Sequence, residues 1–554
     1  MKLVEQLAVL ARRGVLLPGR PDRVARQLAA LQLWGFGLAG EARQAAARSP
    51  DRVAVIDEER GAATYAQLLE GSERAAAVLA AALGGAPEGE PRARVGLLCR
   101  NHLGLVEVLI GASSIGVDVV LLNTGLSRAQ VRAVVRDQGL ALLVHDRDLT
   151  EVAAGASEAS EVSEASGASE AWGASEASGD LCPLLDEDEL LRRMHAVPRE
   201  DLGSSAPPSR RGRTIVLTSG TTGTPKGARR PHPRNFAALA SILDRIPFGV
   251  GETVLLSAPI FHTWGLAGLQ LCLGLRSTMV LQRRFDPQVA RSALRRHGCQ
   301  GMFAAPVMVQ RMIDLADDGL GPDGAGEGGA RVGRLGGARL RVVALSGSLL
   351  PSGLATRFMA AYGPVLYNLY GSTEVSWVSV ATPADLAADP DCAGRPPRGT
   401  TVAIVDETGA AVADGDVGRI FVGNDLLFDG YTDGASRPTW HGLVSTGDLG
   451  RLVDGRLHVE GREDDLVISG GENVYPRELE AAIARLPEVR EVSVFGVPDV
   501  EFGQRLVACV AFRAGHGLAA DEVVARVRPQ VSRPALPRDV VVLDELPRNA
   551  TGKV

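Results

Sequence analysis

Thr214-Ile-Val-Leu-Thr-Ser-Gly-Thr-Thr-Gly-Thr-Pro-Lys-Gly227 places an apolar strand directly before a loop of small and hydroxyl residues. Glycines in such a loop let the backbone approach a ligand closely, and hydroxyl side chains donate hydrogen bonds. Lys226 adds a positive charge, so the stretch predicts a polyphosphate-binding loop. It is not the G-x-x-x-x-G-K-[ST] nucleotide loop, because no Ser or Thr follows Lys226. A plain Gly/Ser connection is the alternative.

Outward from this loop, the chain has the pattern of an α/β protein. From Arg94 to Leu122, two apolar runs flank a helical pattern, which predicts strand, helix and strand. At 554 residues the chain exceeds what one hydrophobic core usually supports. We therefore expect a large body with at least one further domain.

Charge and cysteine content narrow the class of protein. A net charge of −7 leaves no excess of Lys and Arg to neutralise a nucleic acid backbone, so we expect no nucleic acid partner. The six cysteines are far apart and form no C-x-x-C pair, which favours a reducing cytosol over a disulfide framework or a zinc site. No apolar run reaches the ~18 residues of a membrane span.

Residues 1–40 mix Leu, Val and Ala with five arginines. This pattern predicts an N-terminal helical extension, an amphipathic helix pair packed on the body. Peripheral contact with a membrane surface is the alternative.

Two segments lack the large apolar side chains that would offset ordering entropy. Residues 151–179 repeat Ala, Ser and Glu, and we expect a disordered insertion there. Residues 319–337 are rich in Gly and Asp, which indicates a loop.

Near the end, the pattern changes to that of a small α/β unit. Gly450 to Val459 predicts a hairpin, because Asp454-Gly455 supplies the positive φ angles of a tight turn. Pro476 can open a helix, with apolar positions following at helical spacing. Short apolar strands then run over residues 492–497, 506–512 and 540–543. The natural domain boundary lies near residues 462–465.

Several further motifs follow in order along the chain: Thr64-Tyr-Ala-Gln-Leu68, Asn123-Thr-Gly-Leu126, Tyr370-Gly-Ser-Thr-Glu374, Ser445-Thr-Gly-Asp448, Gly461-Arg-Glu-Asp-Asp465, Gly470-Gly-Glu-Asn-Val-Tyr-Pro476 and Pro547-Arg-Asn-Ala-Thr-Gly-Lys553. Together with the loop at 218–227, they resemble the signatures of the adenylate-forming superfamily. That superfamily contains acyl-CoA synthetases, amino-acid adenylation domains and beetle luciferases. The resemblance covers the chain from about Glu41 to its end, apart from the Ala/Ser/Glu insertion.

The resemblance implies an α/β fold with a large multi-subdomain N-terminal body of mixed sheets and helices, over residues 41–463. A small mobile C-terminal α/β domain would follow over residues 464–554. It implies an AMP-forming ligase that uses ATP and Mg²⁺ to convert a carboxylic acid to an acyl-adenylate, and then passes the acyl group to coenzyme A.

The resemblance also assigns roles around the nucleotide. Glu374 would hold the metal with Thr218, and Asp448 would anchor the ribose with help from Arg462. Cations and aligned donors are needed because a carboxylate attacks an anion and pyrophosphate leaves. The full nucleotide set is Thr218, Ser219, Gly220, Thr221, Thr222, Gly223, Lys226, Ser346, Gly347, Ser348, Tyr370, Gly371, Ser372, Thr373, Asp448, Arg462 and Lys553.

Catalytic and moving parts are assigned in the same way. Lys553 resembles the lysine that reaches the α-phosphate from the small domain, and Lys226 and His262 complete the catalytic set. Asp464 resembles the hinge on which the small domain rotates. Gly470, Gly471, Glu472 and Asn473 resemble the segment that lines the thiol tunnel.

The segment Pro259-Ile-Phe-His-Thr-Trp-Gly265 bears on the acid. Amino-acid adenylation domains place an aspartate near the position of His262, and this chain has no acid there, which disfavours an amino acid. A medium- or long-chain fatty acid is the first choice. The candidate pocket walls are largely apolar: Trp264, Gly265, Gly268, Ala305, Val307, Met308, Val375 and Trp377.

Alternatives stay open from sequence. An aryl acid fits the same walls, and a carrier-protein pantetheine could replace coenzyme A as acceptor. A luciferase-like oxygenase shares the first half-reaction, and a non-catalytic binding protein is the remaining alternative. Retention of the charged residues Lys226, Glu374, Asp448, Arg462 and Lys553 argues against the last.

Overall fold

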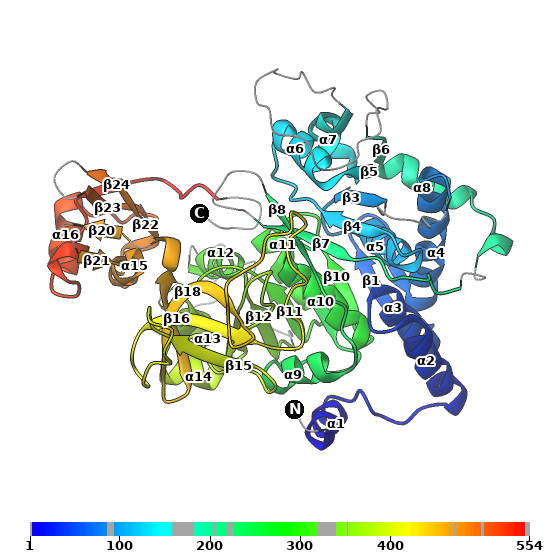
Figure 1. Ribbon diagram of the computed structural model, residues 1–554, viewed down its shortest axis with the longest axis horizontal. Coiled ribbons are helices and arrows are strands. Elements are labelled where there is room, and N and C mark those ends of the chain that lie inside the picture. The colour runs from blue at the N-terminus through cyan, green and yellow to red at the C-terminus, as the bar shows by residue number, and fades with distance from the viewer. Residues whose placement is uncertain are drawn as a thin grey trace, which may run out of the picture.

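The computed structural model describes residues 3–85, 93–157, 182–202, 206–218, 225–317, 339–351, 353–465, 467–469, 472–499 and 503–548. Figure 1 shows a large body and a smaller unit at one side that carries the C-terminal elements. Four β-sheets organise the described chain. The expected α/β fold with a large body and a small C-terminal unit is confirmed.

The largest sheet has eight strands, and its six interior strands run parallel. Both edge strands are antiparallel to their neighbours. In spatial order the strands are β14 (Ser379–Ala381), β13 (Leu366–Tyr370), β12 (Val342–Leu345), β11 (Gly301–Ala304), β9 (Thr253–Leu256), β10 (Thr278–Leu281), β1 (Val53–Asp57) and β2 (Gly61–Thr64).

A six-stranded sheet contains the strand, helix and strand predicted from Arg94 to Leu122. They are β3 (Arg94–Leu98), α5 (Leu103–Ser114) and β4 (Asp118–Leu121). The other strands are β6 (Leu184–Asp186), β5 (Leu140–His145), β7 (Thr214–Thr218) and β8 (Lys226–Arg229). Strands β7 and β8 form an antiparallel hairpin whose connection is the predicted phosphate loop.

Helices connect and cover these sheets. They are α3 (Leu38–Arg48), α4 (Tyr65–Ala82), α6 (Arg128–Gln138), α7 (Thr150–Ala153), α8 (Glu187–Ala196), α9 (Ala237–Arg245), α10 (Thr263–Gly274), α11 (Pro287–Arg296), α12 (Pro306–Asp317), α13 (Leu354–Tyr362) and α14 (Pro383–Ala388). The motif Thr64-Tyr-Ala-Gln-Leu68 has a local structural role. Thr64 accepts a hydrogen bond from the Gln67 backbone, and Gln67 bonds back to Thr64, which is a capping box that begins α4.

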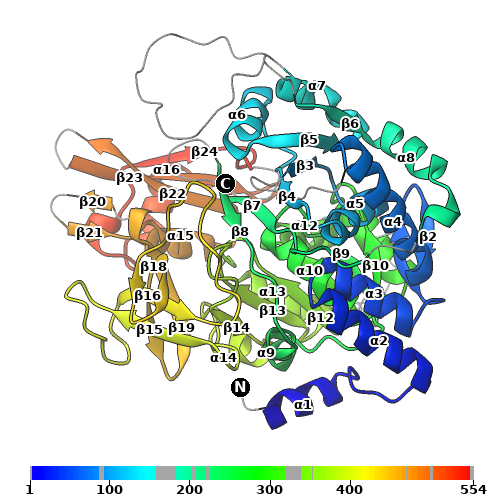
Figure 2. The ribbon, with the colours of Figure 1, turned by 45° about the vertical axis from the view of Figure 1, so that its right-hand side comes forward.

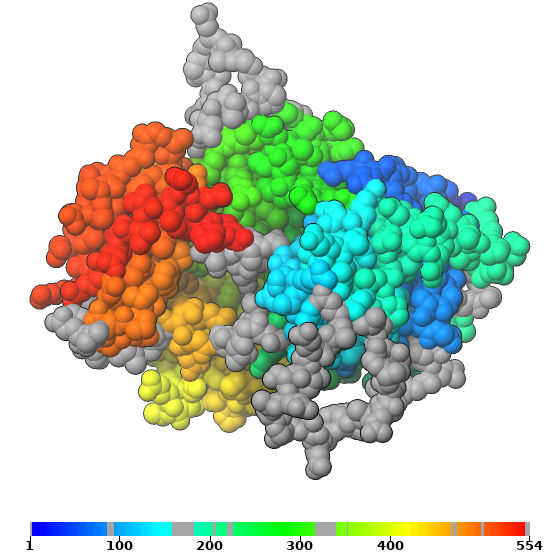
Figure 3. Space-filling view, turned by 90° about the horizontal axis from the view of Figure 1, so that it is seen from above, coloured from blue at the N-terminus to red at the C-terminus, as the bar shows by residue number. Residues whose placement is uncertain are grey.

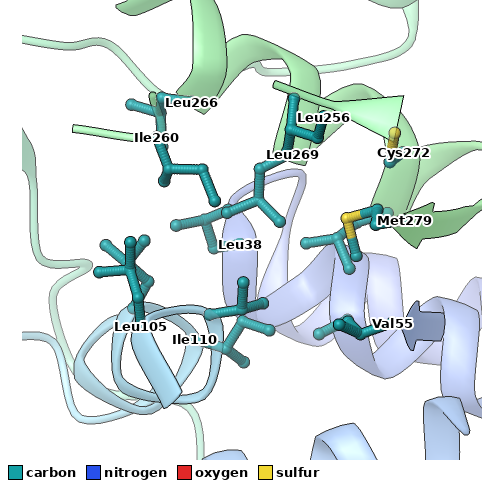
Figure 4. Close-up of a cluster of buried hydrophobic side chains, with 14 of the residues drawn as sticks. Leu38, Val55, Leu105, Ile110, Leu256, Ile260, Leu266, Leu269, Cys272 and Met279 are labelled. Atoms are coloured by element: carbon teal, nitrogen blue, oxygen red, sulfur yellow. The ribbon is translucent and has the colours of Figure 1, made fainter. Parts of the chain in front are cut away.

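The main core lies where the two large sheets meet. Leu266, Leu269 and Cys272 on one face of α10 pack against Leu38 of α3 and Ile110 of α5 (Figure 4). Because this face of α10 is held in the core, its opposite face is fixed in position. That opposite face lines the cavity described below.

A third sheet is antiparallel and precedes the small unit. It consists of β15 (Thr401–Val405), β16 (Gly418–Gly423), β17 (Thr439–Trp440), β18 (Leu443–Val453) and β19 (Arg456–Arg462). The predicted hairpin is confirmed, because Asp454 and Gly455 connect β18 to β19 with φ of 50° and 70°. Positive φ at both positions matches the right-handed twist of the strands.

The small unit follows a 3-10 turn at Glu463–Asp465. Its strands are β20 (Val467–Ser469), β21 (Glu472–Val474), β22 (Val489–Asp499), β23 (Gly503–Phe512) and β24 (Asp539–Val542). Helix α15 (Pro476–Ala484) begins at Pro476 as predicted, and α16 (Ala520–Val527) covers the same core. Figure 3 shows this unit, in orange and red, as a lobe beside the green and cyan body.

The N-terminal segment forms the expected helix pair, α1 (Leu3–Arg12) and α2 (Pro21–Trp34). Val9 and Leu10 of α1 are buried, and α1 packs against α9. Figure 2 shows α1 at the lower edge of the molecule. The boundary expected after residue 40 falls inside α3, so the extension continues into the body without a break. None of the helices in the described ranges is long and apolar enough to cross a membrane.

The Ala/Ser/Glu insertion was expected to be disordered over residues 151–179, and this expectation is wrong for the first residues of the segment. Residues 151–157 are helical, in α7 and the 3-10 turn Ala154–Ser157. Small side chains allow this, because Gly155 and Ala156 pack closely against the chain around Arg128. The rest of the insertion and the expected loop at 319–337 lie outside the described residues.

Candidate active site

A cavity of about 1230 Å³ lies at the carboxyl ends of the parallel strands of the eight-stranded sheet. This is the edge where open α/β sheets bind ligands. The motif residues after β12 and β13 line it, as do Thr218 at the end of β7 and Asp448 on β18. Parallel strands therefore bring segments far apart in sequence to one place.

All of the described residues expected to bind nucleotide line this one cavity. They are Thr218, Lys226, Ser346, Gly347, Ser348, Tyr370, Gly371, Ser372, Thr373, Asp448 and Arg462, together with the expected metal ligand Glu374. Ser219, Gly220, Thr221, Thr222, Gly223 and Lys553 lie outside the described residues. The charged groups of the resemblance thus face a common space, so none of those described is isolated on the surface.

Glu374 is the most strongly constrained carboxylate of the cavity. It is 5% exposed, accepts a hydrogen bond of 2.6 Å from the Tyr431 hydroxyl, and lies 3.6 Å from Arg437. Burial alone would raise the pKa of Glu374, but the Tyr431 hydrogen bond and the Arg437 charge hold it below its usual value. The carboxylate is therefore ionised at neutral pH.

Arg230 adds a second cation to this group. Its guanidinium donates to the Thr373 carbonyl at 2.6 Å and to the Ser376 hydroxyl at 2.9 Å. Burial lowers the pKa of Arg230 to about 10, so it remains charged at neutral pH. Sequence reasoning missed Arg230, Tyr431 and Arg437. For Arg230 the sequence offered one signal. Arg229 and Arg230 follow the predicted loop closely enough to belong to the strand that leaves it.

Asp448 and Tyr370 form a second polar pair in the cavity. The Tyr370 hydroxyl donates to Asp448 Oδ2, and Asp448 lies opposite Arg462 in the β18–β19 ladder. Burial raises the pKa of Asp448 above its usual value despite these partners. An ionised carboxylate held in this way can accept hydrogen bonds from two adjacent hydroxyls.

Lys226 begins β8 directly opposite Thr218. The Thr218 hydroxyl donates to the Lys226 carbonyl at 3.3 Å, and the Lys226 ammonium lies 3.8 Å from Asp433. The Lys226 side chain is 40% exposed. The two ends of the phosphate loop are thus fixed in the β7–β8 hairpin at the wall of the cavity.

His262 and Trp264 stand at the start of α10 and line the cavity. Trp264 donates its indole N–H to the Ala304 carbonyl at 3.1 Å and packs on Phe303 at 5.0 Å between ring centroids. Trp377 also lines the cavity, and its indole donates to Thr400 at 2.8 Å. These two tryptophans are wall residues, as expected for the acyl pocket.

The other six expected wall residues do not line the cavity, and the expectation is corrected for them. A side chain at Gly265 would meet the Pro259 carbonyl, and one at Gly268 would meet Leu256, so both serve close packing of α10. The remaining four are buried in hydrophobic clusters and do not themselves line the cavity: Ala305, Val307, Met308 and Val375. These residues were predicted to be wall residues because a sequence does not distinguish a side chain buried in the core from one that lines a cavity.

Helix α9 supplies the wall that sequence reasoning missed. Ala238, Leu239 and Ile242 line the cavity, and so do Ile246 and Phe248 after the helix. On α10 the lining positions recur at helical spacing: His262, Thr263, Ala267, Gln270, Leu271 and Gly274. The apolar part of the cavity therefore runs between α9 and α10.

The small unit borders the cavity from the opposite side. Arg477, Glu480 and Phe495 line it, and Asp464 and Asp465 line it at the junction. The Asp464 side chain is 63% exposed and its carboxylate lies 3.9 Å from Arg462. Gly470 and Gly471 lie outside the described residues, and Glu472 and Asn473 begin β21.

Asp464→Pro is expected to impair the second half-reaction while adenylate formation continues. Proline fixes φ near −65°, so the backbone at the junction could no longer rotate freely. Thioester formation from supplied acyl-adenylate should fall by about tenfold or more, or ~1.4 kcal/mol of barrier. Pyrophosphate exchange measures the first step, and Asp464→Ala is the control that keeps backbone freedom. Equal loss of both steps would contradict the hinge role.

A buried cluster outside the cavity holds Cys99, His102 and Asp146, whose ligating atoms lie within 4.8 Å of one another. His102 Nε2 contacts Asp146 at 2.9 Å, and His102 Nδ1 accepts from the Leu105 backbone at 3.3 Å. His102 thus caps α5 through Nδ1 and pairs with Asp146 through Nε2, so both ring nitrogens have protein partners. These contacts give the cluster a structural role at the start of α5.

Comparisons with known proteins agree with this geometry. The family model "AMP-binding enzyme" matches residues 42–432, and "AMP-binding enzyme C-terminal domain" matches residues 478–553. A 2-succinylbenzoate–CoA ligase of Geobacillus kaustophilus is 30% identical over 92% of this chain and 95% of its own length. A feruloyl-CoA synthase of Amycolatopsis sp. is 29% identical over 89% of this chain and 92% of its own.

A solved structure has a similar fold. The o-succinylbenzoate CoA synthetase of Bacillus subtilis, in complex with its acyl-adenylate intermediate, has a TM-score of 0.74 and 25% identity. The likeness covers 93% of this chain and 96% of that chain.

Proposed function

The chain belongs to the AMP-binding enzyme family as an AMP-forming acyl-CoA ligase, and on this premise we propose that it activates an elongated, largely apolar carboxylic acid. A medium- or long-chain fatty acid is the first candidate. Domain limits at residues 41–463 and 464–554, after the N-terminal extension, belong to the same proposal.

The observation that carries the proposal is the length of the acyl cavity. Its lining residues on α10 extend from His262 to Gly274. Twelve helical steps of 1.5 Å give about 18 Å along the helix. A cavity of this length with walls such as Leu239, Ile242 and Phe248 suits an extended chain better than a single compact ring.

ATP and coenzyme A are the co-substrates of this family branch. A carboxylate oxygen of the acid attacks the α-phosphorus of ATP and pyrophosphate leaves with the electrons of the broken P–O bond. The thiolate of coenzyme A then attacks the acyl carbon, and AMP leaves. Lys226 and Lys553 would supply cations during the first step, and Asp448 would hold the ribose hydroxyls with Arg462 nearby.

The cavity suits Mg²⁺, which usually takes one or two carboxylates and completes its shell with phosphates and water. Tyr431 and Arg437 both contact Oε1 of Glu374, so we assign Oε2 to the metal and the Thr218 hydroxyl as a second ligand. Bound Mg²⁺ would neutralise charge on the phosphates. Arg437 and Tyr431 keep the Glu374 carboxylate ionised and oriented for this purpose.

His262 lies at the start of α10, between the nucleotide residues and the acyl part of the cavity. We propose that it contacts the substrate carboxylate or its adenylate ester at this junction. The thiol tunnel is proposed to pass Gly470, Gly471, Glu472 and Asn473.

An aryl acid is the second candidate. The similar proteins named above act on succinylbenzoate and ferulate, which favours a ring near Trp264 and Phe303. A carrier-protein pantetheine in place of coenzyme A is the remaining alternative for the acceptor.

A substrate panel tests both candidates. Purified full chain is incubated with ATP, Mg²⁺, coenzyme A and a graded series of alkanoic, aryl and amino acids, and AMP and acyl-CoA are read by mass. Alkanoic acids of intermediate or long chain should give the highest kcat/KM. Aryl acids leading the panel would replace the first candidate with the second, and release of ADP in place of AMP would contradict the mechanism.

A further inference from the structure

The part of the cavity between α9 and α10 is lined mainly by apolar side chains, but it also contains polar ones. Gln270 and Glu41 line the cavity beside Leu271 and Phe36. They come from different helices, α10 and α3, which pack against each other. A cavity made only for an unsubstituted hydrocarbon chain would gain nothing from two polar groups there, because burying them without partners costs free energy.

Glu41 is a buried carboxyl with room for one more partner. It is 8% exposed, and Oε2 accepts a hydrogen bond of 3.1 Å from Gln44. A side chain at Gly274 would come within 3.4 Å of Oε2, so this glycine keeps the carboxyl next to the end of α10. Burial raises the pKa of Glu41 to about 8, which leaves it protonated and able to donate at neutral pH.

Gln270 stands one helical turn before Gly274, on the face of α10 that lines the cavity. Residues four apart on a helix have Cβ positions about 5–6 Å from each other, so Gln270 stands within one turn of Gly274, the residue that adjoins the Glu41 carboxyl. The Gln270 side chain is half-buried, and its amide makes no hydrogen bond to a residue within the described ranges. The amide can therefore bind a ligand group without first breaking a hydrogen bond inside the protein.

We propose that Glu41 and Gln270 form a distal polar subsite that takes an uncharged oxygen, a hydroxyl or a keto group, on the acyl chain. The inference rests on the proposed function and specifies its substrate class as chain-oxygenated acids. From His262, eight helical steps reach Gln270 and twelve reach Gly274, so the oxygen would lie about 12–18 Å from the start of α10. Neutral donors and acceptors on both sides match a hydroxyl or carbonyl better than a charged group.

Matched acids test the subsite. At each chain length from eight to sixteen carbons, the plain alkanoic acid competes with three counterparts for the full chain with ATP, Mg²⁺ and coenzyme A. These carry a terminal hydroxyl, a keto group at the penultimate carbon, or a terminal amine. We expect the hydroxy or keto acid to exceed the plain acid in kcat/KM by about tenfold at the length that reaches the subsite, the worth of one or two buried hydrogen bonds. The proposal would be overturned if the oxygenated acid is not preferred at any chain length. A preference for the terminally aminated acid would also overturn it.

Variants connect the preference to the two side chains. Glu41→Leu and Gln270→Leu should each reduce the preference to about twofold or less while plain acids are still activated. Glu41→Gln keeps a donor and an acceptor and should retain it. Gln310→Leu is the matched control, because Gln310 is a buried glutamine on α12 that does not line the cavity. A preference that survives both leucine substitutions would contradict the subsite.

The proposed ligase function and the distal polar subsite can fail separately. If no acid yields AMP, the proposed function fails, and binding of the matched acids to the full chain by calorimetry still reports on the subsite. If plain acids yield acyl-CoA as well as oxygenated ones, the ligase function stands and the subsite is wrong.

Discussion

Glu374→Gln is expected to reduce adenylate formation by about two to three orders of magnitude, the usual effect of removing one element of charge stabilisation in a dry site. The substitution keeps the size and the hydrogen bond from Tyr431 but removes the negative charge. Arg437 and Arg230 would then lose the charge of Glu374, and a divalent cation would lose its only carboxylate partner in our assignment. Pyrophosphate exchange at varied Mg²⁺ measures the loss, and higher Mg²⁺ should be needed for half-maximal rate.

Two controls isolate the role of the charge. Tyr431→Phe leaves the carboxylate but removes its hydrogen-bond donor, which costs about 1.5–3 kcal/mol for a charged acceptor, so its effect should be smaller. Glu407→Gln makes the same chemical change outside the cavity and should leave the rate unchanged. Unaltered Mg²⁺ dependence in Glu374→Gln would contradict the metal assignment.

The pH dependence follows from the same contacts. Because the pKa of Glu374 is held below its usual value, its carboxylate stays ionised until the pH falls below the ordinary range for glutamate. Asp448 behaves in the opposite way, since burial raises its pKa above the usual value for an aspartate. Nucleotide affinity measured at varied pH should therefore begin to fall at a higher pH than the titration of an ordinary aspartate would give, as Asp448 protonates.

Local chemistry explains what could be predicted from the sequence. The Asp454-Gly455 turn, the start of α15 at Pro476 and the strand, helix and strand from Arg94 depend on neighbours in the chain, and all three are confirmed. The motifs at Tyr370 and Asp448 were recognisable because they resemble the signatures of the adenylate-forming superfamily and follow in the same order. Parallel strands then bring them together at one sheet edge.

The parts of the site that could not be predicted from the sequence depend on packing between segments far apart in the chain. Leu239 and Ile242 on α9 look like ordinary core residues, and only their position opposite α10 makes them cavity walls. Conversely, Val307 and Met308 are as apolar as any wall residue but lie under the sheet in a separate cluster. Glu41 could not be found either, since its place beside Gly274 depends on the contact between α3 and α10.

Lys553→Ala is expected to reduce adenylate formation by about two to three orders of magnitude and to leave thioester formation from supplied acyl-adenylate largely intact. The described chain is held up to Arg548, because Leu546 is buried and Arg548 lies 3.5 Å from Glu491. Five further residues can extend about 17 Å, so a lysine at 553 can reach well beyond the small unit. In the first step it would offset charge on the α-phosphate. In the second step AMP leaves with one more negative charge, but rotation of the small unit about the hinge that Asp464 resembles would by then have moved the lysine away.

The two half-reactions must be measured separately for this variant. Pyrophosphate exchange reports the first, and acyl-CoA formed from synthetic acyl-adenylate reports the second. Lys553→Arg keeps the charge but changes its shape, so it should recover part of the first step if charge is what matters. Arg548→Ala is the matched control for loss of a nearby cation and should leave pyrophosphate exchange within about threefold, because Arg548 pairs with Glu491 inside the small unit and does not line the cavity. Survival of exchange in Lys553→Ala would show that the cation at the α-phosphate comes from Lys226 or Arg437 alone.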